Sequence, residues 1–153
     1  MGVLPYFESI RRKAQEQEIP VSLAVLSGSV VILSTDVAAE LKELLPQVPL
    51  SFSSIGHLNP KDYVQVGFPS SAKGIVVAVT ELFQRGRIQV LVGTKSLLGE
   101  GWDAPCVNSL ILGSFVGSFM LSNQMRGRAI RIWSRHPEKT SNIWHLVAVQ
   151  AQA

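Results

Sequence analysis

The sequence predicts an α/β protein with a mainly parallel sheet and helices on both faces. Residues 88–92 and 109–112 form mostly apolar runs, which we interpret as strands buried on both sides. Helical patterns alternate with such runs along the chain, and this alternation favours parallel strands joined by helices. The length of 153 residues fits one domain, so we expect residues 1–153 to fold as a single domain.

The first elements of the chain are a helix and two strands. Residues 6–18 are predicted to form a polar helix that packs on one side, because its few apolar side chains recur at helical spacing. Two β-rich runs follow, at residues 21–26 and 30–33. The Ser-Gly-Ser triplet at 27–29 separates them and is typical of a hairpin or a tight bend.

Further elements are bounded by turn and capping residues. A short amphipathic helix is predicted over residues 37–45 and ends before Pro46. Strand-like pieces at 50–55 and 63–68 alternate with Gly and Pro breaks. Gly86 ends a helix that we expect over residues 72–85. The remaining predicted elements are a helix over residues 121–134 and strands over residues 88–92, 109–112 and 143–149.

The composition indicates that something covers part of the surface. Only 16% of the residues are charged, against about 25% in an average soluble domain, and 46% are hydrophobic. Either a membrane or a missing partner would cover such a surface. The uncharged stretches 19–35, 44–60 and 104–125 carry Pro, Ser, Asn, Gln or Gly, whereas a spanning helix needs about 20 mostly apolar residues. We therefore expect no membrane partner.

Cysteine and histidine usage excludes two further classes of protein. Cys106 is the only cysteine, so the chain is not a disulfide scaffold. No Cys/His spacing indicates a zinc site, and we expect no metal ligands in this chain. Residues 1–10 lack the basic segment and apolar core of a signal peptide, which predicts a cytoplasmic protein.

A polar, glycine-rich loop follows the strand at residues 88–92. Ligands of α/β sheets bind at the carboxyl ends of the strands, where this loop is expected to lie. Thr94 offers a hydroxyl and an N–H group to a phosphate, and Asp103 can accept from sugar hydroxyls. The alternative reading of these residues is a plain Gly-rich connection that Asp103 caps.

An arginine-rich helix is the second candidate site. On a helix, Gln124, Arg128, Arg131 and Arg135 would share one face, while Met125, Ala129, Ile132 and Trp133 would line another. Clustered guanidinium groups repel one another unless an anion or a carboxylate is supplied. The alternative is a solvated basic face, but the use of Arg rather than Lys favours docking to phosphate.

The two segments together resemble a known family. VGTKSLLGEGWDAP at 92–105 and QMRGRAIR at 124–131, separated by one apolar strand, resemble motifs V and VI of superfamily 2 helicases and translocases. The resemblance covers the second, C-terminal RecA-like domain of that motor, over about residues 80–147. Motif IV has its best match at residues 30–36.

The resemblance implies roles for individual residues. The arginine fingers that reach the γ-phosphate of ATP would be Arg128 and Arg131. Three further positions would face ATP, with the aspartate on the ribose: Gly101, Asp103 and Gln124. A nucleic-acid phosphate would be contacted by Thr94, assisted by Lys95.

Two motor features are missing from the chain. It contains neither the Gly-x-x-x-x-Gly-Lys-[Ser/Thr] loop that cradles phosphates nor an Asp-Glu pair after an apolar strand to hold magnesium. By resemblance, ATP and Mg²⁺ would be bound mainly by an N-terminal RecA-like domain that is absent here. We therefore expect the C-terminal part of a larger ATP hydrolase, without ATPase activity on its own. The GEGWDAP form, with Gln opening motif VI, favours DNA over RNA as the partner.

A non-catalytic module that keeps the RecA-like fold is the alternative function. It would use the basic helix face to bind nucleic acid or a protein. Asp103 and both motif VI arginines favour the motor, because simple backbone binding does not require that combination. A ligand-free α/β domain is a third possibility. The tryptophans are predicted to be buried anchors or core residues: Trp102, Trp133 and Trp144.

Overall fold

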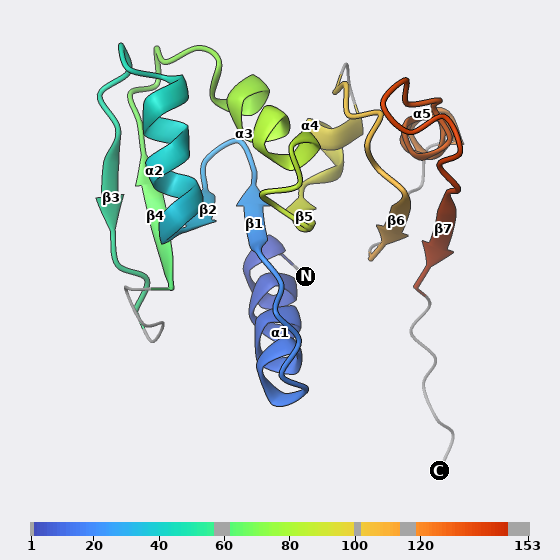
Figure 1. Cartoon of the computed structure of the whole chain (residues 1–153), viewed down its shortest axis with the longest axis horizontal. Helices are drawn as coiled ribbons and strands as arrows, with labels where there is room; N and C mark the ends of the chain where they lie inside the picture. Colours follow the sequence, from blue (N-terminus) through green and yellow to red (C-terminus); the bar gives the residue numbers. More distant parts are fainter. Residues whose placement is uncertain (1, 57–61, 100–101, 114–118, 147–153) are drawn as a thin grey trace. The chain divides into compact units, whose positions relative to one another are not determined.

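The structure, a computed structural model, describes residues 2–56, 62–99, 102–113 and 119–146 (Figure 1). The chain divides into two compact units, Met1–Leu97 and Leu98–Ala153, and each is described by itself. Both units combine helices and strands, so the predicted α/β class is confirmed. That the whole chain forms one domain stays a prediction.

The first unit is built on a five-stranded sheet. The strand order is β3-β4-β2-β1-β5. In the sequence, α1 precedes the first strand, α2 lies between β2 and β3, and α3 lies between β4 and β5. The bounds are α1 Val3–Glu16, β1 Leu23–Leu26, β2 Val31–Ser34, α2 Thr35–Leu44, β3 Ser51–Ser53, β4 Tyr63–Gly67, α3 Ile75–Gln84 and β5 Val90–Gly93. The helix α4, Lys95–Gly99, runs across the boundary between the two units.

Strand directions correct the prediction of a mainly parallel sheet. β1 pairs with β5 in parallel, but β1–β2, β2–β4 and β3–β4 are antiparallel. The cause is the short connection after β1, because a parallel crossover needs a dozen or more residues. Ser27 N donates to Val30 O at 3.0 Å, and Val30 N donates to Ser27 Oγ at 3.0 Å. The hairpin alternative at 27–29 is therefore confirmed.

Helices cover both faces of this sheet, as predicted. Alternate residues of β1 face opposite sides: Leu23 and Val25 join the cluster with Phe7 of α1, whereas Ala24 and Leu26 pack with α2 and α3. Such two-sided burial explains why β1 is apolar throughout.

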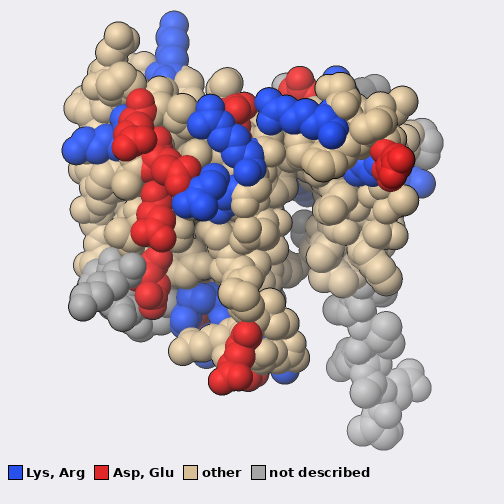
Figure 2. Space-filling view, in the orientation of Figure 1, with Lys and Arg blue, Asp and Glu red and all other residues tan. Residues whose placement is uncertain are grey.

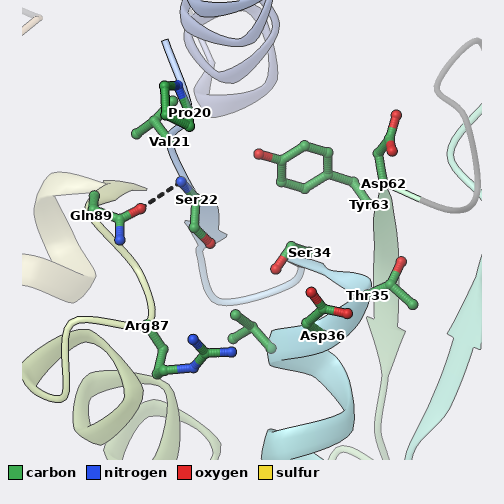
Figure 3. A pocket seen from close by; sticks show the side chains of 11 residues that line it. Pro20, Val21, Ser22, Ser34, Thr35, Asp36, Asp62, Tyr63, Arg87 and Gln89 are labelled. Carbon is green, nitrogen blue, oxygen red and sulfur yellow. Dashed lines mark hydrogen bonds between the residues drawn. The ribbon is translucent and has the colours of Figure 1, made fainter.

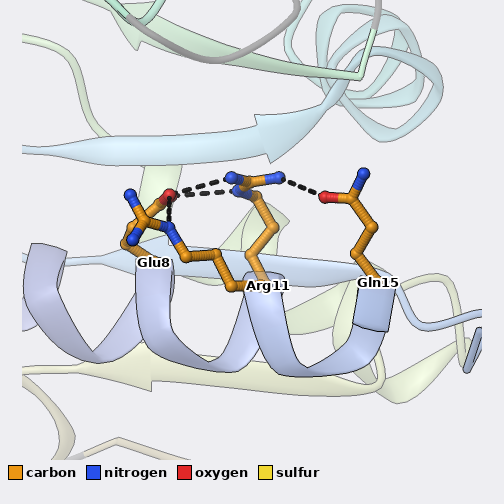
Figure 4. A network of polar contacts seen from close by, with 4 residues as sticks. Glu8, Arg11 and Gln15 are labelled. Atoms are coloured by element: carbon orange, nitrogen blue, oxygen red, sulfur yellow. Dashed lines mark hydrogen bonds and ion pairs between the residues drawn. The ribbon is translucent and has the colours of Figure 1, made fainter. Parts of the chain in front are cut away.

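The helix α1 is polar outside its packing face, as expected for the helix at 6–18. Phe7 is its buried residue and meets Tyr63 edge-on, with ring centroids 5.2 Å apart. Glu8 holds Arg11 at 2.8 Å, and Arg11 Nη1 donates to Gln15 at 3.2 Å (Figure 4). This network lies along the helix and is partly buried, since the side chains of Arg11 and Glu8 are 22% and 19% exposed.

The second unit pairs β6, Ser109–Leu112, with β7, Asn142–His145, in parallel. The helix α5, Phe119–Ala129, contacts both strands. The described part of its core consists of small and large apolar side chains: Trp102, Ala104, Val107, Leu112, Met125 and Ala129. Trp102 is thus buried as predicted. The prediction that Trp144 is a core residue is wrong, since Trp144 is 61% exposed.

The helix α5 ends earlier than the predicted range of 121–134. The carbonyl of Ala129 accepts from Lys139 Nζ at 3.0 Å and also from Ser141 Oγ, which ends the helical bonding pattern there. Arg131 therefore lies outside the helix, and the predicted face shared by Gln124, Arg128, Arg131 and Arg135 is wrong beyond Arg128. Ile132, which was expected on the second face of the same helix, also lies outside α5 and is 83% exposed.

Within the ranges that the structure describes, no helix has both the length and the apolar character needed to cross a bilayer.

Candidate functional site

An ion pair in the second unit joins the ends of the two motif segments. Arg131 Nη1 donates to Asp103 Oδ1 across 28 positions of sequence. Asp103 is directed outward because its neighbours Trp102 and Ala104 are buried. The side chains of Arg131 and Asp103 are 46% and 66% exposed, so the pair lies at the surface. The sequence placed both residues in the candidate site but did not predict their contact.

Arg128 lies on α5, one residue before the helix ends. Its side chain is half-buried, and among the described residues its Nε atom is buried without a hydrogen-bond partner. Leaving a buried donor unsatisfied typically costs about 1–3 kcal/mol. An acceptor that reached this nitrogen would recover that free energy. Gln124 is exposed one turn earlier on the same helix.

Gly127 leaves the surface of α5 open next to Arg128. A Cβ atom built on Gly127 would meet no atom within 4 Å. Glycine inside a helix is about 0.5–1 kcal/mol less stable than alanine. Packing within the described residues therefore gives no reason for this glycine, and the open surface is available to a ligand or partner.

Thr94 and Lys95 belong to the first unit. Thr94 directly follows β5, so it lies at the carboxyl edge of the parallel β1–β5 pair, as predicted. It is half-buried and its Oγ1 accepts from Ser96 at 3.5 Å. Lys95 is exposed at the start of α4. Gly101 lies outside the described residues, so its predicted role is not described further.

Lys139 is a residue of this region that the sequence did not single out. Its Nζ atom donates to the carbonyls of Pro105 at 2.8 Å, Val107 at 2.8 Å and Ala129 at 3.0 Å. Burial lowers the pKa of Lys139. No side-chain pattern signals such a residue, because all of its partners are backbone groups.

No family model, no curated protein and no solved structure matches this chain. A function for this chain is therefore argued from the site residues and their geometry alone. In the second unit they consist of a paired Arg131, an Arg128 with an unsatisfied Nε and an open glycine on the same helix. These groups offer cationic donors to an anion.

A separate pocket of 580 Å³ lies in the first unit, at the amino ends of β1 and β5 (Figure 3). Much of its polar lining already serves the fold. Ser22 N donates to Gln89 Oε1 at 2.6 Å, Leu23 N donates to the Tyr63 hydroxyl at 3.3 Å, and Arg87 Nε donates to Glu40, which lies outside the lining, at 2.6 Å. None of the predicted site residues lines this pocket.

Metal ligands do not gather in the described ranges: no three His, Cys, Asp or Glu side chains lie close enough together to hold an ion.

One side of α2 in the first unit carries acidic residues. Asp36, Glu40 and Glu43 are spaced so that they share one side of the helix. Figure 2 shows acidic side chains in a column over this helix. Glu40 on this face is paired with Arg87, and Figure 2 shows basic side chains beside the acidic column, so charges of both signs lie here.

Proposed function

We propose that this chain is the C-terminal RecA-like motor domain of an ATP-dependent superfamily 2 helicase or translocase, with DNA favoured over RNA. The observation that carries the proposal is the Asp103–Arg131 ion pair, because it brings the ends of the two motif segments together. In this proposal the parent protein hydrolyses ATP, and its N-terminal RecA-like domain binds most of the ATP and Mg²⁺. The chain alone would not hydrolyse ATP.

The arginines are suited to an incoming phosphate. Exposed ion pairs contribute only about 0.2–1 kcal/mol, so Arg131 can leave Asp103 at little cost when a phosphate arrives. Arg128 has a buried Nε donor that lacks an acceptor among the described residues. Arginine fingers in other nucleotidases raise the rate by about 10³–10⁵. Asp103, once released, has carboxylate oxygens that can accept from ribose hydroxyls.

A RecA-like fold is part of the proposal. The parallel pairs β1–β5 and β6–β7, and the helices on both faces of the larger sheet, support it. The antiparallel additions β2, β4 and β3 depart from a parallel sheet. Thr94 and Lys95 at the carboxyl edge of β5 are the proposed contacts to the nucleic-acid backbone, because a hydroxyl and an ammonium group can donate to phosphate oxygens.

The test compares ATP turnover of the gene's full-length product with that of this 153-residue chain. Each is assayed alone and with single- or double-stranded DNA or RNA. We expect stimulated turnover in the full-length product only, with the best stimulating polymer naming the partner. A full-length product that stays inactive with every polymer would favour the non-catalytic binding module.

Two variants test whether Arg131 acts as an arginine finger. In the full-length product, Arg131→Ala should lower stimulated turnover by about 10³-fold or more. The matched control is Arg85→Ala, because Arg85 also forms an exposed ion pair, with Glu81 at 2.9 Å, but on α3. Turnover in the control should stay near that of the wild type. Unchanged turnover in Arg131→Ala would refute the role of Arg131.

A further inference from the structure

Lys139 binds backbone oxygens with its whole ammonium group. An ammonium has three N–H donors, and the three oxygens of Pro105, Val107 and Ala129 lie at 2.8, 2.8 and 3.0 Å. Carbonyl oxygens that converge on one point repel one another unless a cation lies between them. Lys139 therefore holds these three carbonyl groups together.

The three carbonyls come from the two segments that carry the candidate site. Pro105 and Val107 follow Asp103 by two and four residues. Ala129 is the last residue of α5 and stands between Arg128 and Arg131 in the sequence. The carbonyl end of a helix is also its negative end, where a cation is favoured. One side chain thus ties the Asp103 segment to the arginine segment.

The ion pair between Arg131 and Asp103 is too weak to hold the two segments in place by itself. Arg131 and Asp103 are 46% and 66% exposed, and such pairs are weak. Lys139 is brought back toward α5 by a turn in which His136 N donates to Trp133 O at 2.9 Å and Lys139 N donates to His136 O at 3.0 Å. The turn and the ammonium act together to fix the distance between the two segments.

We propose that Lys139 is a positioning residue that holds Arg128 and Arg131 in place relative to Asp103. This inference rests on the proposed function, since its consequence is the placement of the arginine fingers. A misplacement of about 1 Å in an active site can lower the rate by about 10²-fold. Lys139 itself would touch neither ATP nor nucleic acid.

The first test measures the contact directly in the 153-residue chain. The ¹⁵N-resolved guanidinium signals of Arg131 are compared between wild type, Asp103→Asn and Lys139→Met. We expect Lys139→Met to shift these signals toward those of Asp103→Asn, because the pair is no longer held. The control is Lys42→Met, which removes an exposed lysine from the last turn of α2. Arg131 signals in Lys139→Met that match the wild type would overturn the proposal.

The second test measures turnover in the full-length product. Lys139→Met should lower kcat by about 10²-fold while the KM for the stimulating polymer changes little. The comparison is a core variant with a matched loss of Tm, such as Val79→Ala in the first unit. A loss of kcat no larger than in that variant would mean that Lys139 only stabilises the fold.

A third variant keeps the proposal testable if Lys139→Met does not fold. Lys139→Arg keeps the positive charge, but a planar guanidinium cannot aim three donors at the same three carbonyls. We expect it to fold, with an intermediate loss of kcat and partly shifted Arg131 signals; wild-type values for both would overturn the proposal. If the wild-type full-length product shows no ATPase activity, the proposed function fails, and the Arg131 signals still decide whether Lys139 holds the pair.

Discussion

Replacing Gly127 with alanine should make the protein more stable and, if the proposed motor function holds, lower its ATP turnover. Gly127 lies inside α5, and the added Cβ would meet no atom within 4 Å. No clash therefore opposes the change in the described structure. The same open surface is where we expect a phosphate or the partner domain to approach Arg128.

The size of the stability gain follows from helix propensity. Alanine in a helix interior is favoured over glycine by about 0.5–1 kcal/mol, because glycine loses more backbone freedom on folding. For a chain of this length, 1 kcal/mol shifts Tm by about 2–4 °C, so we expect a rise of about 1–4 °C. Gly86→Ala is the control with the opposite sign. Its φ of 78° is left-handed, which costs a residue with a Cβ atom about 1–2 kcal/mol.

The assay has two readouts. Thermal unfolding of the 153-residue chain gives Tm for both variants, and stimulated ATP turnover is measured in the full-length product. A lower Tm for Gly127→Ala would refute the inference that the helix surface is open. A higher Tm with unchanged turnover would refute the close approach of a ligand or partner at Gly127.

Two further predictions concern stability. Asp103→Asn should change the free energy of unfolding in urea by less than about 1 kcal/mol, because its ion pair with Arg131 is exposed. Leu82→Ala in the fully buried core should lower that free energy by about 2–5 kcal/mol. Equal losses in the two variants would contradict this prediction. Burial raises the pKa of Tyr63 above 10.0, so the folded state keeps a proton that the unfolded state loses. Stability should therefore fall as pH rises through 10.0, less steeply in Tyr63→Phe, and equal slopes would exclude Tyr63 as the cause.

Local patterns predicted most of the first unit. The apolar runs of β1 and β2, the Ser-Gly-Ser turn at 27–29 and the stop at Gly86 were readable because each depends on neighbouring residues. The direction of the strands was not predicted correctly. Alternating strands and helices favour a parallel sheet, but the short connection after β1 allows only an antiparallel hairpin. The hairpin prevailed, and the antiparallel strands β4 and β3 pair beyond it.

The candidate site was predictable as a set of residues but not as a geometry. Arg131 and Asp103 stand 28 positions apart, and only folding shows that they meet. The helix over α5 was predicted too long because its periodic side chains continue past Ala129. Its end is set by Lys139 and Ser141, which reach back to a single carbonyl. A backbone contact of this kind leaves no trace in the spacing of side chains.

We expect the strand β3 to affect how this protein behaves in concentrated solution. It is an edge of the five-stranded sheet, and its three residues, Ser51, Phe52 and Ser53, are all exposed. An edge strand is a template on which a second copy can add by backbone pairing, and a very short edge offers few such groups. With three residues, β3 gives a neighbouring chain little to pair with, so the shortness of this strand limits edge-to-edge pairing at this side of the sheet.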